Sequence, residues 1–73
     1  MRADRLIARV VRSRFLVTTD SDESFDGVLT QWDEHHFVFS DTVSVGRNGD
    51  RVHLDSDLWV PRSRIRYMQA VTV

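Results

Sequence analysis

The sequence predicts a mainly β protein, a small antiparallel barrel of five strands that follows one N-terminal helix. Three observations predict this fold class. Residues 2–14 have a helical period, the rest of the chain consists of short β-prone runs separated by polar turns, and 73 residues allow a single domain over 1–73. One helix followed by short strands with tight turns is typical of small barrels.

The helix is predicted from the 3.6-residue period of residues 2–14. Apolar side chains fall on one arc and arginines on the opposite arc: Ala3, Leu6, Ile7, Val10 and Val11 against Arg2, Arg5, Arg9 and Arg12. Asp4 lies in the first turn, where the helix dipole favours an acid. We therefore expect Leu6, Ile7 and Val10 to be buried against the barrel or a neighbouring subunit.

Three β-prone runs follow the helix and predict the first three strands. They are separated by the polar turns 20–23 and 33–36, and the strands are 15–19, 25–32 and 37–45. In the third run, the alternation places Phe37, Phe39, Val43 and Val45 on one face. The loop 46–50 contains Asn-Gly, which is the strongest short hairpin signal in the chain.

Residues 51–60 alternate most cleanly and predict one continuous fourth strand. Its two faces are Val52, Leu54, Leu58 and Val60 on one side, and Arg51, His53, Asp55, Asp57 and Trp59 on the other. Pro61 ends this strand because proline cannot donate a backbone hydrogen bond. Residues 62–64 then form a short turn, and residues 65–71 form the fifth strand.

Composition favours self-association. A domain of this length buries only about 60% of the surface that its unfolded chain exposes, so a small chain often needs an additional stabilising element. The sequence has no cysteine, which excludes disulfides and thiolate metal sites. A partner subunit is then the most plausible additional source of stability, and we predict a homo-oligomer.

Charge is unevenly distributed although the net charge is only −1. All ten basic residues are arginine, and most of them lie near the two ends of the chain, whereas ten acids lie between residues 15 and 60. Such asymmetry fits a surface for an anionic partner, and it fits equally well two opposite faces that meet in an oligomer. The apolar runs are far shorter than a membrane span, so we expect a cytoplasmic protein without a membrane partner.

No motif predicts catalysis, a metal or a cofactor. Residues 20–26 have some of the oxygen spacing of a calcium loop, but Phe25 stands where the sharp turn needs glycine. His35 and His36 point in opposite directions if they lie in a strand, which does not suit a zinc site. His53 and its neighbouring acids have no nucleophile assigned beside them. We therefore predict a protein that is not an enzyme, with no catalytic residue and no cofactor.

The layout resembles the Sm-like (LSm) family, a group of SH3-like small barrels. Gly27, Leu29 and Asp33 match the Gly-x-Leu-x-x-x-Asp spacing of the first motif of that family, and Glu34-His35 looks like the turn that follows. Val60 and Ile65 bracket a short turn, as in its second motif. The resemblance implies a ring of five to seven subunits, joined by the fourth strand of one and the fifth strand of the next.

Both nucleotide-binding motifs of the family are altered here. Phe37 stands where the family has a base-recognising Asn, and Pro61-Arg62-Ser63-Arg64 replaces Arg-Gly and the Asn that follows. RNA is nevertheless the ligand that the resemblance implies, since a histidine ring at a loop tip can stack on a base. The alternative is a protein-interaction or assembly module, an accessory or virus-encoded subunit that has lost RNA binding.

These considerations give two sets of candidate residues. The first set would bind RNA through aromatic stacking and phosphate contacts: His35, His36, Arg62, Arg64, Arg5, Arg9 and Arg12. The second set would form the oligomer or partner interface: Trp59, Tyr67, Val60 and Ile65. Trp59 in particular is a large aromatic residue at the end of a polar face, which indicates a covered surface unless it packs under the helix.

Overall fold

Six strands and one 3-10 turn make up the fold. The computed structural model describes residues 7, 9 and 12–71. Within them the elements are β1 (Arg14–Thr19), β2 (Ser24–Trp32), β3 (His36–Val45), β4 (Arg51–His53), β5 (Leu58–Pro61), the 3-10 turn (Arg62–Arg64) and β6 (Ile65–Ala70). The mainly β fold is therefore confirmed, and the first three strands and the last strand lie where the sequence predicts them.

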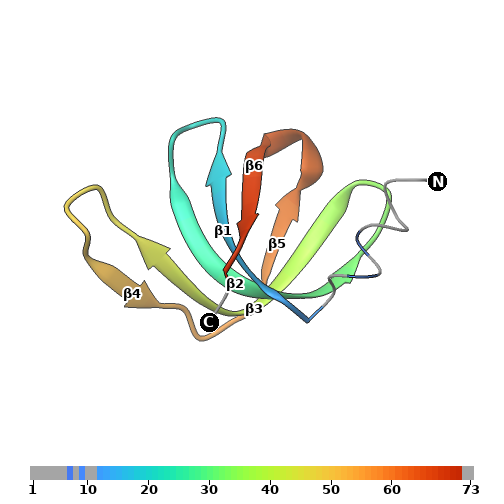
Figure 1. Ribbon diagram of the computed structural model, residues 1–73, viewed down its shortest axis with the longest axis horizontal. Helices are drawn as coiled ribbons and strands as arrows, with labels where there is room; N and C mark the ends of the chain where they lie inside the picture. The colour runs from blue at the N-terminus through green and yellow to red at the C-terminus, as the bar shows by residue number, and fades with distance from the viewer. Residues whose placement is uncertain (1–6, 8, 10–11, 72–73) are drawn as a thin grey trace.

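The strands form one antiparallel sheet in the order β4-β3-β2-β1-β6. β5 lies outside this order and pairs with the first part of β3, while β4 pairs with its last part. β2 and β3 are the two longest strands, and they curve through the whole molecule (Figure 1). Two register shifts between them, next to Gly27 and Thr30, produce the curvature that bulges introduce. β5 and β6 pair with β3 and β1 respectively, and among the described strands they do not pair with each other.

The predicted fourth strand is wrong in one respect, because it is split into β4 and β5. β3 bends at Asp41, whose φ of 50° lies in the left-handed region, so a straight partner strand cannot follow it. The connecting residues are held to β3 instead, since the Leu54 amide donates to the Thr42 carbonyl at 2.9 Å and Ser40 donates to Asp57 at 3.1 Å. β4 extends beyond the core, which leaves Val52 59% exposed although the alternation predicts an inward position.

The same bend changes the predicted face of the third strand. Phe37 and Phe39 lie in the core as predicted. Val43 lies instead beside Arg14 and Asp26 on the opposite face of the sheet. The left-handed Asp41 and the register shifts in β2–β3 interrupt the period-two alternation between Phe39 and Val43.

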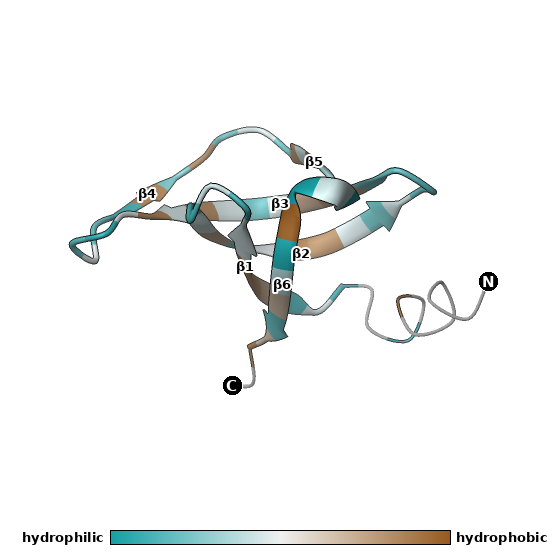
Figure 2. Cartoon of the chain, turned by 90° about the horizontal axis from the view of Figure 1, so that it is seen from above, coloured by the Kyte–Doolittle hydropathy of each residue, from teal (hydrophilic) through white to brown (hydrophobic). Residues whose placement is uncertain are grey.

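The core fills the concave side of the sheet. Its buried members come from four strands and from the N-terminal segment: Ile7, Phe15, Val17, Phe25, Leu29, Phe37, Phe39 and Val60. The rings of Phe25 and Phe39 meet edge to face with centroids 5.2 Å apart, a favourable arrangement for aromatic pairs. Colouring by hydropathy shows hydrophobic segments along the strands and hydrophilic loops at their ends (Figure 2).

The helix predicted over residues 2–14 lies largely outside the described residues. Ile7 and Arg9 are helical, and Ile7 is buried in the core as predicted. Leu6 and Val10 are not among the described residues. The predicted end of the helix is wrong, since Arg12 has a φ of 72° and Arg14 already begins β1.

Turns follow the predicted chemistry. In the hairpin between β3 and β4, the amide of Gly46 donates to the Asp50 carbonyl at 2.7 Å, and Gly49 has the positive φ of 89° that glycine adopts readily. Pro61 is the last residue of β5, and the residues after it form the 3-10 turn that leads directly into β6. This short link brings Arg62 and Ser63 to the β2–β3 loop.

Candidate functional site

The β2–β3 loop is organised by one carboxylate. The Asp33 Oδ1 atom accepts hydrogen bonds from the amides of His35 and His36, at 2.8 and 2.6 Å. These two bonds, the His35 bond foremost, hold the pKa of Asp33 below its ordinary value of 3.8. Asp33 therefore fixes the position of both histidines at the loop tip, which is the role expected of an Asx turn.

The 3-10 turn meets this loop at Arg62. The Arg62 amide donates to the His35 carbonyl at 2.8 Å, and the Arg62 guanidinium lies over the Phe37 ring, 4.5 Å from its centroid. Phe37 itself is only 8% exposed. The structure thus brings together His35, His36 and Arg62, around a hollow of about 280 Å³ that Glu34, Pro61 and Ser63 also line.

Arg64 and Arg66 are directed elsewhere. Arg64 Nε donates to Asp20 at 3.0 Å, and Arg66 donates to Asp22 at 2.8 Å, so both are paired with the acidic β1–β2 loop. Arg66 also donates to the Asp20 carbonyl at 3.3 Å. The three arginines after Pro61 therefore do not form one continuous basic surface, because acids of the β1–β2 loop pair with two of them.

The N-terminal arginines of the predicted RNA set are less defined. Arg9 and Arg12 are exposed, and Arg5 is not among the described residues. The Arg12 side chain has no hydrogen bond or ion pair with another described residue. Neither arginine lines the hollow beside His35 and His36.

The predicted interface residues divide into two kinds. Trp59 is 62% exposed and Tyr67 is 50% exposed, and they lie on the edge strands β5 and β6. The Trp59 ring meets the His36 ring edge to face with centroids 6.4 Å apart. Val60 is a core residue and Ile65 packs against the core, so their side chains serve the chain's own interior.

A polar network on the outer face was not predicted from the sequence. Asp26 is buried, and its carboxylate receives hydrogen bonds from Arg14 and Arg51, while Arg14 also donates to Asp41. His53 Nε2 lies 2.8 Å from the other Asp41 oxygen. The hydrogen bond with His53 and the charge of Arg14 lower the pKa of Asp41. No local pattern signals this network, because its members come from four strands.

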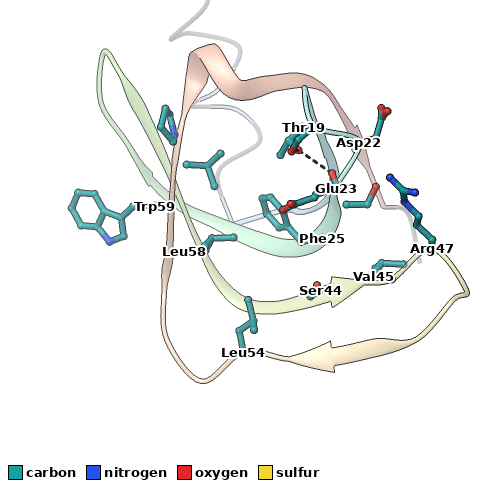
Figure 3. A pocket seen from close by; sticks show the side chains of 15 residues that line it. Thr19, Asp22, Glu23, Phe25, Ser44, Val45, Arg47, Leu54, Leu58 and Trp59 are labelled. Atoms are coloured by element: carbon teal, nitrogen blue, oxygen red, sulfur yellow. Dashed lines mark hydrogen bonds between the residues drawn. The ribbon is translucent and has the colours of Figure 1, made fainter.

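A larger hollow lies on the concave side beneath β5 (Figure 3). Its volume is about 630 Å³, and Figure 3 shows Phe25, Leu54 and Leu58 turned toward it while Trp59 points away. Polar residues of the β1–β2 loop and the β3–β4 hairpin form its rim, among them Asp22, Glu23 and Arg47. The sequence does not reveal this hollow, since it depends on the separation of β4 from β5.

Among residues 7, 9 and 12–71, no group of three or more histidine and acidic side chains is arranged to hold a metal ion. Over the same residues, no helix is both long enough and apolar enough to cross a membrane.

Solved structures of very similar fold are known. A crystal structure of the P. aerophilum SmAP1 heptamer matches with a TM-score of 0.87 at 14% identity, covering 100% of this chain and 97% of that one. A crystal structure of a heptameric archaeal Sm protein matches with a TM-score of 0.82 at 14% identity, covering 93% and 98%. Neither protein-family models nor curated proteins give a match to the sequence. The resemblance predicted from Gly27, Leu29 and Asp33 is confirmed by the three-dimensional structure, and the chain has the Sm-like fold.

Proposed function

We propose that this chain is a subunit of a homo-oligomeric ring that acts as a non-catalytic binding module. One observation carries the proposal: the sheet has two edges, one formed by β4 and β5 along β3 and the other by β6, and among the described strands each of these three has a partner on one side only. Unpaired strand edges favour the addition of another strand. Because the two edges differ, copies would join head to tail, and such contacts close into a ring when the rotation allows it.

The size of the assembly is the direct test. The two structural neighbours are described as heptamers, so seven copies of this 8.5 kDa chain are the size expected first. Light scattering and native mass spectrometry over a range of concentrations should give one discrete mass above the monomer. A particle that stays at the mass of one chain at tens of micromolar would refute the ring.

Single-stranded RNA is the ligand that we propose for the ring. The supporting observation is the convergence of two histidine rings and one guanidinium, His35, His36 and Arg62, around one small hollow. Aromatic rings and guanidinium planes are the groups on which unpaired bases stack. Glu34 in the same hollow and the pairing of Arg64 with Asp20 reduce the positive potential. Weak binding at low salt is therefore expected.

A titration of labelled U-rich and A-rich RNA tests this ligand. Phosphate contacts lower affinity roughly as a power of the salt concentration, so binding at about 50 mM salt should be largely lost by about 200 mM. His35→Ala and Arg62→Ala should weaken binding, and Arg47→Ala is the control that removes one charge outside that hollow. Titrations that show no binding at low salt would exclude RNA as the ligand.

A protein-binding role is the second candidate, and a different observation favours it. Exposed Trp59 lies beside His36 on the outer face, and large exposed aromatic residues are typical of protein interfaces. If the RNA titrations show no binding while the discrete oligomer persists, protein binding is the function that remains.

A further inference from the structure

We propose that the β1–β2 loop is an autoinhibitory element, whose aspartates Asp20 and Asp22 hold Arg64 and Arg66 away from the phosphates of RNA bound at the neighbouring hollow. This inference rests on the proposed RNA function and adds to it the regulation of that same site. Its basis is the set of ion pairs between the loop and the two arginines, together with the position and exposure of both partners.

Both arginines are bound by one loop. Arg64 Nε donates to Asp20 Oδ1 at 3.0 Å, and Arg66 Nη1 donates to Asp22 Oδ1 at 2.8 Å. Arg66 Nη2 also donates to the Asp20 carbonyl at 3.3 Å. The loop and the turn between β5 and β6 lie at the same end of the molecule (Figure 1). Each positive charge is thus offset by a negative charge from a segment 44 positions earlier in the chain.

Backbone hydrogen bonds hold the loop in this place. The Asp20 amide donates to the Arg64 carbonyl at 2.8 Å, which ties the loop to the 3-10 turn. Within the loop, the Thr19 amide donates to the Glu23 carbonyl at 2.9 Å, and the Asp22 amide donates to the Thr19 carbonyl at 3.1 Å. The two carboxylates are therefore presented by a fixed backbone. Arg64 can exchange Asp20 for another anion by rotation of its side chain alone.

The two arginines follow directly on the residues of the candidate RNA site. Arg62 and Ser63 line the hollow with both loop histidines, and Arg64 is the next residue and the last of the 3-10 turn. An RNA strand with one base in the hollow continues from it in both directions and carries a phosphate on either side of that base. Arg64 and Arg66 are the basic residues that stand next along the chain from this hollow. They are the cations that such a phosphate would recruit.

The ion pairs are exposed enough to be exchanged. The side chains of Arg64 and Asp20 are 59% and 51% exposed, and those of Arg66 and Asp22 are 51% and 65% exposed. Exposed pairs of this kind contribute little to stability and are screened by salt. The loop therefore acts as an anion within the chain that competes with RNA phosphates, and its removal should not unfold the protein.

The substitution Asp20→Asn tests this competition, because it keeps the shape of the side chain and removes its charge. For a single strand, each phosphate contact contributes about 0.7 to the power with which affinity falls with salt. Relative to 1 M salt, one added contact therefore raises affinity about eightfold at about 50 mM and about threefold at about 200 mM. Asp20→Asn should bind labelled U-rich RNA more tightly than wild type by these factors, with a steeper salt dependence.

A charge-matched control separates the loop contact from a general change in net charge. Asp55 has a fully exposed side chain outside the hollow, so Asp55→Asn removes the same charge without releasing an arginine after Pro61. Its RNA affinity should stay within about twofold of wild type, since salt screens distant charges. Equal gains for Asp20→Asn and Asp55→Asn would overturn the inference.

A double-mutant cycle identifies the released group. Arg64→Ala should change RNA affinity by less than about twofold when Asp20 is present, because the loop already offsets that charge. In the Asp20→Asn background, the same Arg64→Ala substitution should abolish the about eightfold gain. A gain that persists without Arg64 would show that the loop does not act through this arginine, and it would overturn the inference.

The outcomes distinguish the inference from the proposed RNA function. If wild type binds RNA and Asp20→Asn binds no more tightly, the autoinhibitory loop is overturned and RNA remains the ligand. If wild type shows no binding at low salt but Asp20→Asn/Asp22→Asn binds, the loop inhibits completely and both proposals are supported. If neither protein binds, both are overturned.

A second measurement covers the case in which a loop variant does not fold or assemble, which light scattering on each protein would reveal. Arg64→Ala/Arg66→Ala leaves the loop intact, and its RNA affinity at low salt should equal that of wild type. A loss of affinity in this variant would show that the arginines already contact RNA in the presence of the loop, and it would overturn the inference.

Discussion

Asp26 is the residue whose replacement tests the outer-face network most sharply. Its side chain is 9% exposed and lies between Arg14 and Arg51, whose side chains are 29% and 57% exposed. Removing one partner of a fully buried ion pair costs about 3–5 kcal/mol, because the remaining charge is left without compensation. Here solvent screens both arginines in part, and exposed pairs contribute only about 0–1 kcal/mol. For Asp26→Ala we therefore expect the free energy of unfolding to fall by about 2–3 kcal/mol.

That loss is large for this chain. At about 0.05–0.15 kcal/mol per residue, a domain of this length has a total stability of roughly 4–11 kcal/mol. Since 1 kcal/mol shifts the Tm of a small domain by about 4–8 °C, Asp26→Ala should lower the Tm by at least about 8 °C. Circular dichroism melts at fixed protein concentration measure this shift, because assembly makes the Tm concentration-dependent.

Two controls test whether loss of the Asp26 ion pairs causes the lower stability. Arg51→Ala should cost less than Arg14→Ala, because the Arg51 side chain is the more exposed of the two and Arg14 also binds Asp41. The double variant Asp26→Ala/Arg14→Ala should be less unstable than the sum of the single variants, since the two groups interact directly. A Tm for Asp26→Ala within about 2 °C of wild type would show that the network does not stabilise the fold.

Three further outcomes are expected. Gly27→Ala should destabilise by about 1–3 kcal/mol, because its Cβ would lie 2.6 Å from Thr42 Cγ2, and Thr42→Ser should restore most of the loss by removing that methyl group; an additive double variant in chemical denaturation would contradict the clash. The pKa of Asp41 is lowered by His53 and Arg14, so its contribution to stability is complete above the ordinary value of 3.8 and is lost as the pH falls through the lower folded pKa. Asp41→Asn should therefore flatten the pH dependence of the Tm below about pH 4, and an unchanged acid limb would disprove the assignment. Arg62→Ala should cost about 0.5–2 kcal/mol through loss of the stack on Phe37, whereas Arg62→Lys should retain part of it; equal Tm values for all three proteins would exclude a stabilising stack.

Most strands were predictable from local sequence, whereas the bends that divide the longest alternating run, residues 51–60, were not. Alternation and turn residues identified β1, β2, β6 and the Gly46–Asp50 hairpin, because each depends on local chemistry. The split of the fourth strand depends on the left-handed backbone of Asp41 in its partner, which the sequence of residues 51–60 does not contain. A period-two pattern predicts which side chains alternate, but it does not show how far the partner strand stays straight.

In the candidate site, too, local sequence indicated some residues, whereas contacts between distant segments could not be predicted. His35, His36 and Arg62 were named as candidates from the two altered motifs, and the structure places them around one hollow, where the Arg62 amide donates to the His35 carbonyl. Arg64 could not be placed, because its partner Asp20 lies 44 positions away in the chain. The Asp26 network is likewise a product of tertiary structure, and an aspartate next to Gly27 has no sequence signal that distinguishes it from a surface residue.

Pro61 has a consequence for solubility. A chain outside the proposed ring exposes both edges of its sheet, and such edges can recruit foreign strands and start aggregation. Proline at the end of β5 removes one donor from that edge, so β5 is a poor template for continuous cross-β growth. β6 has no proline, and unassembled chains should therefore be most vulnerable there. Conditions that would separate the subunits of the proposed ring, such as dilution during purification, should promote aggregation through β6 before the fold itself is lost.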